Sequence, residues 1–409
     1  MKTVSTSVFA QFINLIPKNI FLKFVEDIDG SRQCNSTKYT RWDQLVALIF
    51  SHIAQCDSLR EIEEGLNRAV GKLPSIQAKV YKRSALSYRN SHDTYLVYEK
   101  LYHALVSRFT SVLGNRLGNR FKKPVYSLDS TTITLCLSLF DWAQYRRCKR
   151  GIKLHTLLNN QTLVPEVIDM TTAKVADIKI IDSVIGKIPA SCIVVIDRGY
   201  NDYKQFAWLS KRGTSFITRI KDNAQTTPYY KGLRSEGSDW GDYEISFTSK
   251  TALACCNGLK FRVIQWYDET TDKWFEFLTN DFDLSAEQIA DLYRDRWQNE
   301  LFFKKIKQNL KIKTFIGTSE NAVMTQIWTV AICTLLIEVL RRKALYTEWS
   351  FPRLLRVITL SLMTYADLLE LIDKTENDET RQLQPENRRQ KESFQLELWG
   401  PEPSGELVA

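Results

Sequence analysis

Two aspartates lie in segments expected to be β-strands, where burying a carboxylate costs free energy unless a partner neutralises its charge. Asp129 lies inside VYSLDSTTITL, an otherwise apolar or hydroxylic segment with the composition of a β-strand, and Asp197 ends the apolar run CIVVID. The carboxyl end of a buried strand is where open α/β sheets place ligand sites. Taken singly, each acid could be a cap or a salt-bridge partner. Two strand acids in one sheet, with no histidine beside them, indicate an oxygen-ligand site for a hard cation.

A third acid, Glu300, lies in LYRDRWQNELFFKKIKQNLKIK, where the acid is followed by a run of lysines. At about 100° per residue on a single α-helix, Tyr293, Arg296, Glu300 and Lys307 fall within a sector of about 60°. Apolar residues gather on a neighbouring sector that would pack on the sheet. A purely structural helix could carry the same residues. The stripe nevertheless allows the acid to reach a metal ion while the bases reach phosphate.

The spacing of these four residues resembles the tyrosine–arginine–glutamate–lysine signature of the insertion-sequence-four family of bacterial DDE transposases. The strings SLDSTTITL and VIDRGY are similar to that family's other two acid motifs, and GIKLH, FITRIK and FLTN resemble segments between them. The resemblance covers roughly residues 124–328. Only about 100 residues separate Asp197 from Glu300, so the intervening insertion is modest.

The resemblance implies a ribonuclease H-like core in which Asp129, Asp197 and Glu300 are catalytic and hold two Mg²⁺ ions, for which Mn²⁺ could substitute. Two metal ions suit phosphodiester cleavage, because they can activate the attacking water or 3′-hydroxyl and stabilise the leaving oxygen. Mg²⁺ keeps several of its waters, so three carboxylates are sufficient.

The resemblance also implies DNA-binding residues around the acids. Members of the family can form a hairpin at the transposon end and flip a base onto a tryptophan, for which Trp297 is the first candidate and Trp274 the second, with core packing as the alternative for both. The basic run WAQYRRCKRGIK lies between the first two expected strands and is either a solvated loop or a phosphate contact. The residues expected to bind DNA are Tyr293, Arg296, Lys307, Trp297, Arg147 and Arg150, with Arg146, Lys149 and Lys153 in the same basic run.

The rest of the chain must supply the elements that hold these residues. The order beyond Pro124 is three strands, a helix, a strand, a helix and a strand, which predicts an α/β fold with a mixed sheet. Before it, two short helices that carry Arg60, Lys82, Arg83 and Arg89 could form a helix-turn-helix-like unit or a bundle with a solvated basic face. The expected divisions are a helical, DNA-binding N-terminal domain (1–115), the first part of the catalytic core (116–221), a β insertion (222–284), the remainder of the core with the signature helix (285–345), a C-terminal helical region (346–373) and a disordered tail (374–409).

Composition limits the setting in which such a protein works. The net charge is +9 and the pI about 9.0, which suggests a polyanionic partner. The eight cysteines contain no CxxC pair and the four histidines are scattered, which argues against a zinc site and favours a reduced cytoplasm. The apolar stretch 322–337 is short for a membrane span and typical of a buried helix, and the N-terminal stretch lacks a signal cleavage site. We therefore expect a cytoplasmic protein with no membrane partner.

Three functions remain open at this point. The first is a transposase that binds terminal inverted repeats, cleaves double-stranded DNA at transposon ends and joins the 3′-hydroxyl ends to target DNA, working as a homodimer in the DNA complex. The second is a metal-dependent nuclease with the same core. The third is a DNA-binding protein of this fold that no longer catalyses, and the intact set of three acids argues against it.

Overall fold

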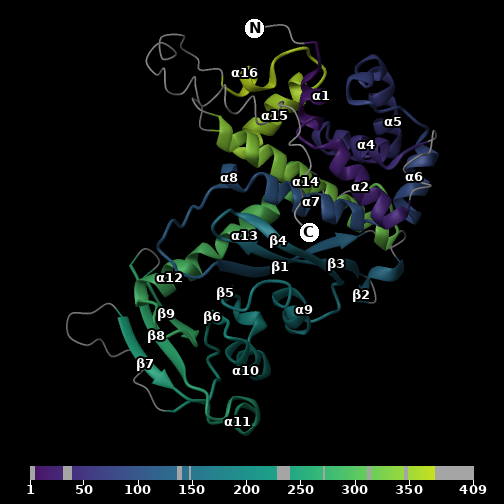
Figure 1. Ribbon diagram of the computed structural model, residues 1–409. Helices are drawn as coiled ribbons and strands as arrows, with labels where there is room; N and C mark the ends of the chain where they lie inside the picture. The colour runs from purple at the N-terminus through teal and green to yellow at the C-terminus, as the bar shows by residue number, and fades with distance from the viewer. Residues whose placement is uncertain are drawn as a thin grey trace, which may run out of the picture. The chain divides into compact units, whose positions relative to one another are not determined.

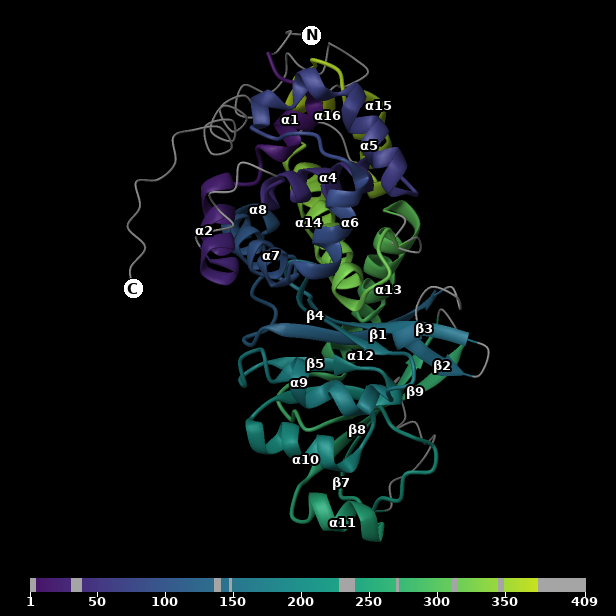
Figure 2. The ribbon, with the colours of Figure 1, turned by 90° about the vertical axis from the view of Figure 1, so that its right-hand side faces the viewer.

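The computed structural model describes residues 5–30, 39–135, 141–146, 149–227, 240–269, 272–310, 315–344 and 349–373. The chain divides into two compact units (Figures 1 and 2). The sheet unit is Gly114–Lys304, and the helical unit joins the residues up to Leu113 with those from Lys305 onward. The sequence-based plan had grouped 285–345 with the catalytic core. Residues from Lys305 group with the N-terminal helices instead, because the long helix of this region packs on them.

A nine-stranded mixed sheet runs through the sheet unit in the order β2-β3-β1-β5-β6-β9-β8-β7, with β4 also paired to β3. Strand β3 is antiparallel to β1 and β4, whereas β5 and β6 run parallel to β1 and to each other. The expected mixed α/β class is therefore confirmed. The strands are β1 (Val125–Leu135), β2 (Gln144–Arg146), β3 (Lys149–Asn159), β4 (Val164–Thr172), β5 (Ile193–Ile196), β6 (Ser215–Arg219), β7 (Trp240–Ile245), β8 (Phe261–Asp268) and β9 (Lys273–Thr279).

Both faces of this sheet are covered, which explains the unbroken apolar run of β5. Val194 and Ile196 point into a core shared with helices α9 (Ile181–Ile185), α10 (Tyr203–Arg212) and α11 (Lys250–Cys256). Ile193 and Val195 point into a second core on the opposite face, which α12 (Ala286–Asp295) covers. Successive side chains of a strand alternate between faces, so a strand buried on both sides must be apolar throughout.

The segment expected as a β insertion continues the main sheet. Strand β9 pairs antiparallel with β6, and β8 and β7 follow outward. Helix α11, which the sequence reading did not anticipate, interrupts these strands and begins at Ser249, whose side chain accepts a hydrogen bond from the Ala252 N–H. Short helical turns were also missed beside α9 and at Arg198–Tyr200.

The helical unit is built around α14 (Glu320–Lys343), which packs against α4, α6, α7 and α15. This helix is long and apolar enough to cross a membrane, but its apolar window is wholly buried in the protein, as expected for a core helix. The prediction that residues 322–337 form a buried helix is confirmed. The other helices of the unit are α1 (Val8–Ile13), α2 (Lys18–Asp29), α4 (Arg41–Ile53), α5 (Leu59–Arg68), α6 (Arg83–His92), α7 (Leu96–Arg108), α8 (Thr110–Leu113), α15 (Phe351–Ser361) and α16 (Leu368–Ile372).

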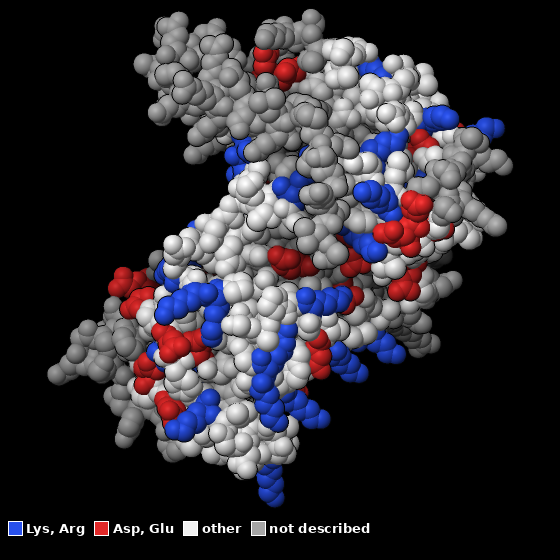
Figure 3. Space-filling model, viewed as in Figure 1, with Lys and Arg blue, Asp and Glu red and all other residues white. Residues whose placement is uncertain are grey.

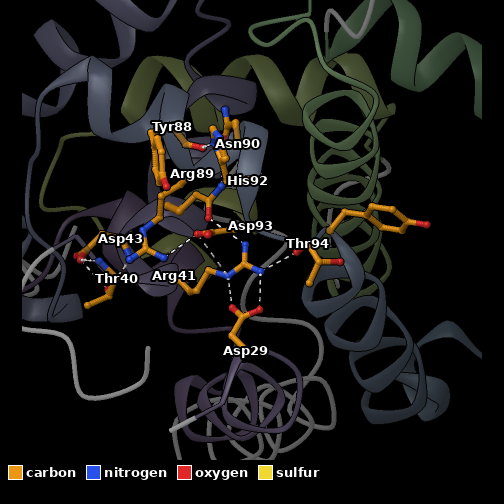
Figure 4. Close-up of polar contacts among 12 residues, drawn as sticks. Asp29, Thr40, Arg41, Asp43, Tyr88, Arg89, Asn90, His92, Asp93 and Thr94 are labelled. Carbon is orange, nitrogen blue, oxygen red and sulfur yellow. Dashed lines mark hydrogen bonds and ion pairs between the residues drawn. The ribbon is translucent and has the colours of Figure 1, made fainter. Parts of the chain in front are cut away.

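A buried ion network joins the ends of α2 and α6 to the start of α4 (Figure 4). The guanidinium of Arg41, only 1% exposed, donates to Asp29 over 2.6 Å and to the carbonyl oxygen of Thr94 over 2.6 Å, and lies 3.8 Å from Asp93. Arg89 donates to Asp93 over 2.6 Å. Because Arg89 is held in this network and is only 16% exposed, the expectation that it lies on an exposed basic face is wrong.

The helix-turn-helix-like alternative would need a short turn between α5 and α6, whereas residues 69–82 separate these helices and include two short 3₁₀ turns. The capping of α5 agrees with its sequence: the Ser58 hydroxyl accepts from the Glu61 N–H, and Glu61 accepts in return from the Asp57 N–H. Arg60, Lys82 and Arg83 are exposed.

One buried acid contributes strongly to the helical unit. Glu338 on α14 is 3% exposed and lies 2.6 Å from Arg341, 3.2 Å from Arg342 and 3.4 Å from Lys305. Burial alone would raise the pKa of Glu338, but the hydrogen bond from Arg341 and the three positive charges outweigh it and lower the pKa to about 2. Folding lowers the pKa of this carboxylate from 4.5 to about 2. The ionised carboxylate therefore stabilises the fold at pH values above about 4.5, and this stabilisation is lost as the pH falls towards 2.

We therefore expect Glu338→Gln to lower the free energy of unfolding at pH 7 by about 3 kcal/mol, because three cations lose a buried partner. The difference from wild type should shrink as the pH is lowered from 5 towards 2, because the wild-type carboxylate becomes protonated in the unfolded chain near pH 4.5 but in the folded chain only near pH 2. Urea denaturation across this range measures the effect, with the exposed Glu64→Gln as control. An equal effect of the two substitutions, or a difference that does not depend on pH, would contradict this account of Glu338.

Candidate active site

Asp129 and Asp197 lie side by side because their strands are parallel neighbours. The register pairs Leu128 of β1 with Ile196 of β5, so the residue that follows each is one of the two aspartates. Asp129 continues β1, and its Oδ1 accepts from the Ser130 N–H over 2.8 Å. Asp197 caps the helical turn after β5, where its Oδ2 accepts from the Gly199 N–H over 3.2 Å. The pairing confirms that the two acids belong to neighbouring strands of one sheet, and their shared cation site stays a prediction.

The guanidinium of Arg296 bridges the two acids. Its Nη1 donates to Asp129 Oδ2 over 2.6 Å, and its Nη2 lies 3.7 Å from Asp197 Oδ1. Its Cζ lies 5.7 Å from the centre of the Tyr293 ring, and its buried Nε has no hydrogen-bond partner among the described residues. The side chains of Asp129 and Arg296 are 14% and 17% exposed, whereas Asp197 is 42% exposed and opens to solvent.

Glu300 belongs to the same electrostatic site. Burial raises the pKa of Asp129, the Arg296 charge and the Ser130 N–H lower it, and the charges of Asp197 and Glu300 raise it again, which leaves it at about 6. The charges of Asp197 and Glu300 thus both act on Asp129, and the guanidinium of Arg296 lies between Asp129 and Asp197. The arrangement carries excess negative charge and attracts a further cation.

The helix that carries the signature is interrupted. Helix α12 ends at Asp295, α13 covers Trp297–Lys304, and a π-helical segment covers Lys305–Asn309. At the break the Arg296 N–H bonds to the Tyr293 carbonyl, three residues back, and the Asn299 N–H bonds to the Arg296 carbonyl in the same way. The single regular helix assumed from the sequence is therefore wrong, and its angular stripe does not apply. Tyr293 and Arg296 still meet, whereas Lys307 belongs to the helical unit.

Lys153 is not available for phosphate in this structure. Its Nζ donates to the Val175 carbonyl oxygen and to Asp177 Oδ1, both over 3.0 Å, and the Ser130 hydroxyl donates to the same Asp177 oxygen. Asp177 thereby supports the residue that follows Asp129, a role that the sequence reading missed. Arg147 and the side chains of Arg146, Lys149 and Arg150 lie outside what the structure describes, although Arg150 is placed in β3 opposite Leu135.

An aromatic-lined pocket of about 280 Å³ adjoins Arg296. Trp266, Phe275, Phe277, Tyr293 and Trp297 contribute its rings, and Trp297 is 56% exposed. Trp274 does not line it and instead packs against Tyr267, with ring centres 5.3 Å apart. Of the two tryptophans singled out from the sequence, only Trp297 is brought to the acids.

Comparison with known protein families shows which family the chain belongs to. Residues 120–336 match the family described as the transposase DDE domain. The chain belongs to the transposase DDE domain family. The resemblance to insertion-sequence transposases seen in the sequence is thereby confirmed. Residues 4–76 match a second family, described as a domain of unknown function, DUF4372.

Relatives of this DDE transposase chain carry matching names. A probable transposase for insertion sequence element IS5377 of Geobacillus stearothermophilus is 28% identical over 62% of this chain and 66% of its own length. A transposase-named protein of Sinorhizobium fredii, y4zB, is 29% identical over 59% of this chain and 64% of its own length, and one for element IS4SA of Synechocystis is 26% identical over 53% and 60%. The chain thus spans slightly less than two thirds of these relatives.

Among solved structures, a piggyBac transposase synaptic complex with hairpin DNA is similar at 10% identity and a TM-score of 0.43, with 98% of this chain and 87% of that chain covered. A likeness at this level carries no conclusion about the fold or the activity of the chain described here.

DDE transposases generally use divalent metal ions, and the oxygen donors of this site suit such an ion. Asp129 and Asp197 already share one cation, the guanidinium of Arg296, and the unpartnered Arg296 Nε shows that this guanidinium is incompletely satisfied. The described residues hold no ready-made cluster of three metal-binding side chains. In this arrangement the Arg296 guanidinium occupies the position between the two carboxylates.

Metal binding should depend on pH through Asp129. Its pKa of about 6 lies well above that of an ordinary aspartate, so a proton competes with the metal ion in the range below pH 6. We expect Mn²⁺ affinity to fall by up to about tenfold per pH unit below pH 6 and to level off above pH 7. Titration calorimetry with Mn²⁺ alone, from pH 5 to pH 8, measures this. Asp129→Asn should bind weakly at every pH, and a flat wild-type profile would exclude Asp129 as the titrating ligand.

Proposed function

We propose that the chain is a transposase of a bacterial insertion sequence that binds terminal inverted repeats, cleaves DNA at transposon ends and joins the 3′-hydroxyl ends to target DNA. The observation that carries the proposal is the pairing of Asp129 with Asp197 across parallel strands, with Glu300 in electrostatic reach of Asp129. The sheet order supports a ribonuclease H-like core, since three antiparallel strands are followed by two parallel ones. Asp129, Asp197 and Glu300 are the proposed ligands of Mg²⁺ or Mn²⁺.

When bound, the metal ions supply Lewis acidity and lower the pKa of an attacking water or 3′-hydroxyl. The protein supplies position and charge. Asp129 is held by β1 and the Ser130 N–H, and Asp197 by its cap on the following turn. Both carboxylates are thus fixed before substrate arrives, so little reorganisation is needed during the reaction.

Arg296 would exchange partners when substrate binds. Its guanidinium neutralises Asp129 and Asp197 in the structure described here, which is a task that a divalent ion can take over. Once released, a guanidinium beside Tyr293 can grip a DNA phosphate through two parallel hydrogen bonds. Lys307, Arg147 and Arg150 remain proposed phosphate contacts.

The aromatic pocket beside Arg296 fits an unstacked base. Its rings offer stacking surfaces, and Trp297 stands exposed at the site where a base would enter. The pocket is consistent with excision through a hairpin, in which a base leaves the stack.

DNA-end recognition is proposed for the N-terminal helices. Helix α6 exposes Arg83, and Lys82 and Arg60 are exposed nearby in sequence. On the face seen in Figure 3, basic side chains are interspersed with acidic ones. A homodimer on DNA, in the cytoplasm, completes the proposal. A nuclease without strand transfer is the alternative that the same site would support.

Replacing any one of the three acids tests the catalytic proposal. We expect Asp129→Ala, Asp197→Ala and Glu300→Ala each to lower cleavage at least about a hundredfold, because each removes stabilisation of the developing charge. DNA affinity should stay close to wild type, since no phosphate contact is removed. Single-turnover cleavage in Mg²⁺ and filter binding measure the two quantities, with the exposed Glu287→Ala on α12 as control. Substantial cleavage by one variant would remove that residue from the catalytic set.

Two of the proposed phosphate contacts can be distinguished by the quantity that each substitution changes. Arg296→Lys keeps the charge but loses the bidentate geometry, so cleavage should slow by at least about tenfold. Lys307→Ala should weaken binding and reduce the salt slope by about one. Salt titration and single-turnover rates distinguish them, with the exposed Lys250→Ala as control. Wild-type rates for the first variant and an unchanged slope for the second would mean that neither residue holds phosphate.

A further inference from the structure

Asn299, the residue before Glu300, is fully buried and bonded to two strands at once. Its Nδ2 donates to the carbonyl oxygen of Ser127 in β1 over 3.1 Å, and its Oδ1 accepts from the Thr156 hydroxyl in β3 over 3.1 Å. Helix α13 is thereby attached to the centre of the sheet through a single amide.

Both attachment points lie next to Asp129. Ser127 precedes Asp129 by two residues on the same strand, and Thr156 is the residue paired directly opposite Asp129 in the β1–β3 register. A shift of α13 along or across the sheet would therefore break one or both hydrogen bonds. The distance between the backbones of Glu300 and Asp129 is fixed by the same two bonds.

We propose that Asn299 is a positioning residue that sets Glu300 against Asp129 for metal binding. The inference rests on the proposed role of Glu300 as a metal ligand. Only a side chain with a donor and an acceptor at one end makes both bonds: aspartate lacks the donor, leucine lacks both, and glutamine is one methylene longer.

Helix docking alone would not require a buried amide. Phe302 and Phe303 of α13 are buried and already supply apolar contact. A buried amide is costly unless its bonds are made, so an apolar residue would dock the helix at least as well. The amide adds directional contacts. Hydrogen bonds fix the rotation and the axial position of α13, whereas apolar contacts alone would allow the helix to shift along the sheet. Such precision matters at a catalytic site, where a displacement of about 1 Å can cost about a hundredfold in rate.

The test uses the full-length protein and a matched pair at Thr156. Thr156→Val removes the hydroxyl and keeps the shape, whereas Thr156→Ser keeps the hydroxyl. Asn299→Leu removes both bonds. The readouts are Mn²⁺ affinity by calorimetry without DNA, the single-turnover rate and affinity on a DNA duplex, and the melting temperature.

We expect Asn299→Leu to weaken Mn²⁺ binding and slow cleavage by about 10–100-fold, while DNA affinity stays near wild type. Thr156→Val should show a smaller loss of the same kind, and Thr156→Ser should behave as wild type. Unchanged Mn²⁺ affinity in a folded Asn299→Leu or Thr156→Val protein would overturn the proposal, as would equal losses for Thr156→Val and Thr156→Ser. If Asn299→Leu does not fold, the Thr156 pair decides alone.

Glu300→Gln separates this inference from the function on which it rests. If Glu300→Gln loses Mn²⁺ affinity and cleavage while Asn299→Leu keeps both, only the positioning role fails. If Glu300→Gln keeps both, the proposed role of Glu300 fails, and the positioning role fails with it.

Discussion

The site is governed by the need to neutralise carboxylates that the sheet forces together. Parallel pairing of β1 with β5 puts Asp129 beside Asp197, and neither can move away without breaking the ladder that holds the centre of the sheet. The guanidinium of Arg296 meets this need in the structure, at 2.6 Å from one acid and 3.7 Å from the other. The Arg296 guanidinium thus supplies a positive charge where the two carboxylates meet.

The elements around the two aspartates hold them in place through packing and hydrogen bonds. Strand β5 is apolar on both faces because helices cover both, and its rigidity holds the two aspartates in register. On one side, Asp177 gathers the Ser130 hydroxyl and the Lys153 ammonium group, so the chain that follows Asp129 is supported. On the other, Asn299 attaches the helix of Glu300 to the strands that flank Asp129. Each support acts on a neighbour of an acid and leaves the acid itself free to bind.

The four residues of the signature are divided between the two compact units. Tyr293, Arg296 and Glu300 belong to the sheet unit, and Lys307 follows in the π-helical segment of the helical unit. Lys305, at the start of that segment, lies 3.4 Å from the buried Glu338 of α14, which anchors the segment within its own unit. The chain therefore passes from one compact unit to the other just after the helix that carries Glu300.

The sequence by itself determined the elements and the chemistry. Apolar runs, turn residues and caps were enough to predict strands β1, β3, β4, β5 and β6 and the buried helix within α14, because these signals are local; the short strand β2 was not predicted. The residue types and spacing of Asp129, Asp197, Tyr293, Arg296 and Glu300 were enough to identify the family.

Only the tertiary structure decided which side chains are free to act. Lys153 is a possible phosphate contact in the sequence, yet it is held by Asp177 from another segment. Arg89 is held by Asp93, four residues further along, whose carboxylate also lies in the buried network of Arg41. Asn299 gave no signal, because a buried amide is recognisable only when its partners on β1 and β3 are known. The short break at Arg296 was likewise not predicted, and the ion pairs of this residue with the two strand acids are recognisable only in the folded chain.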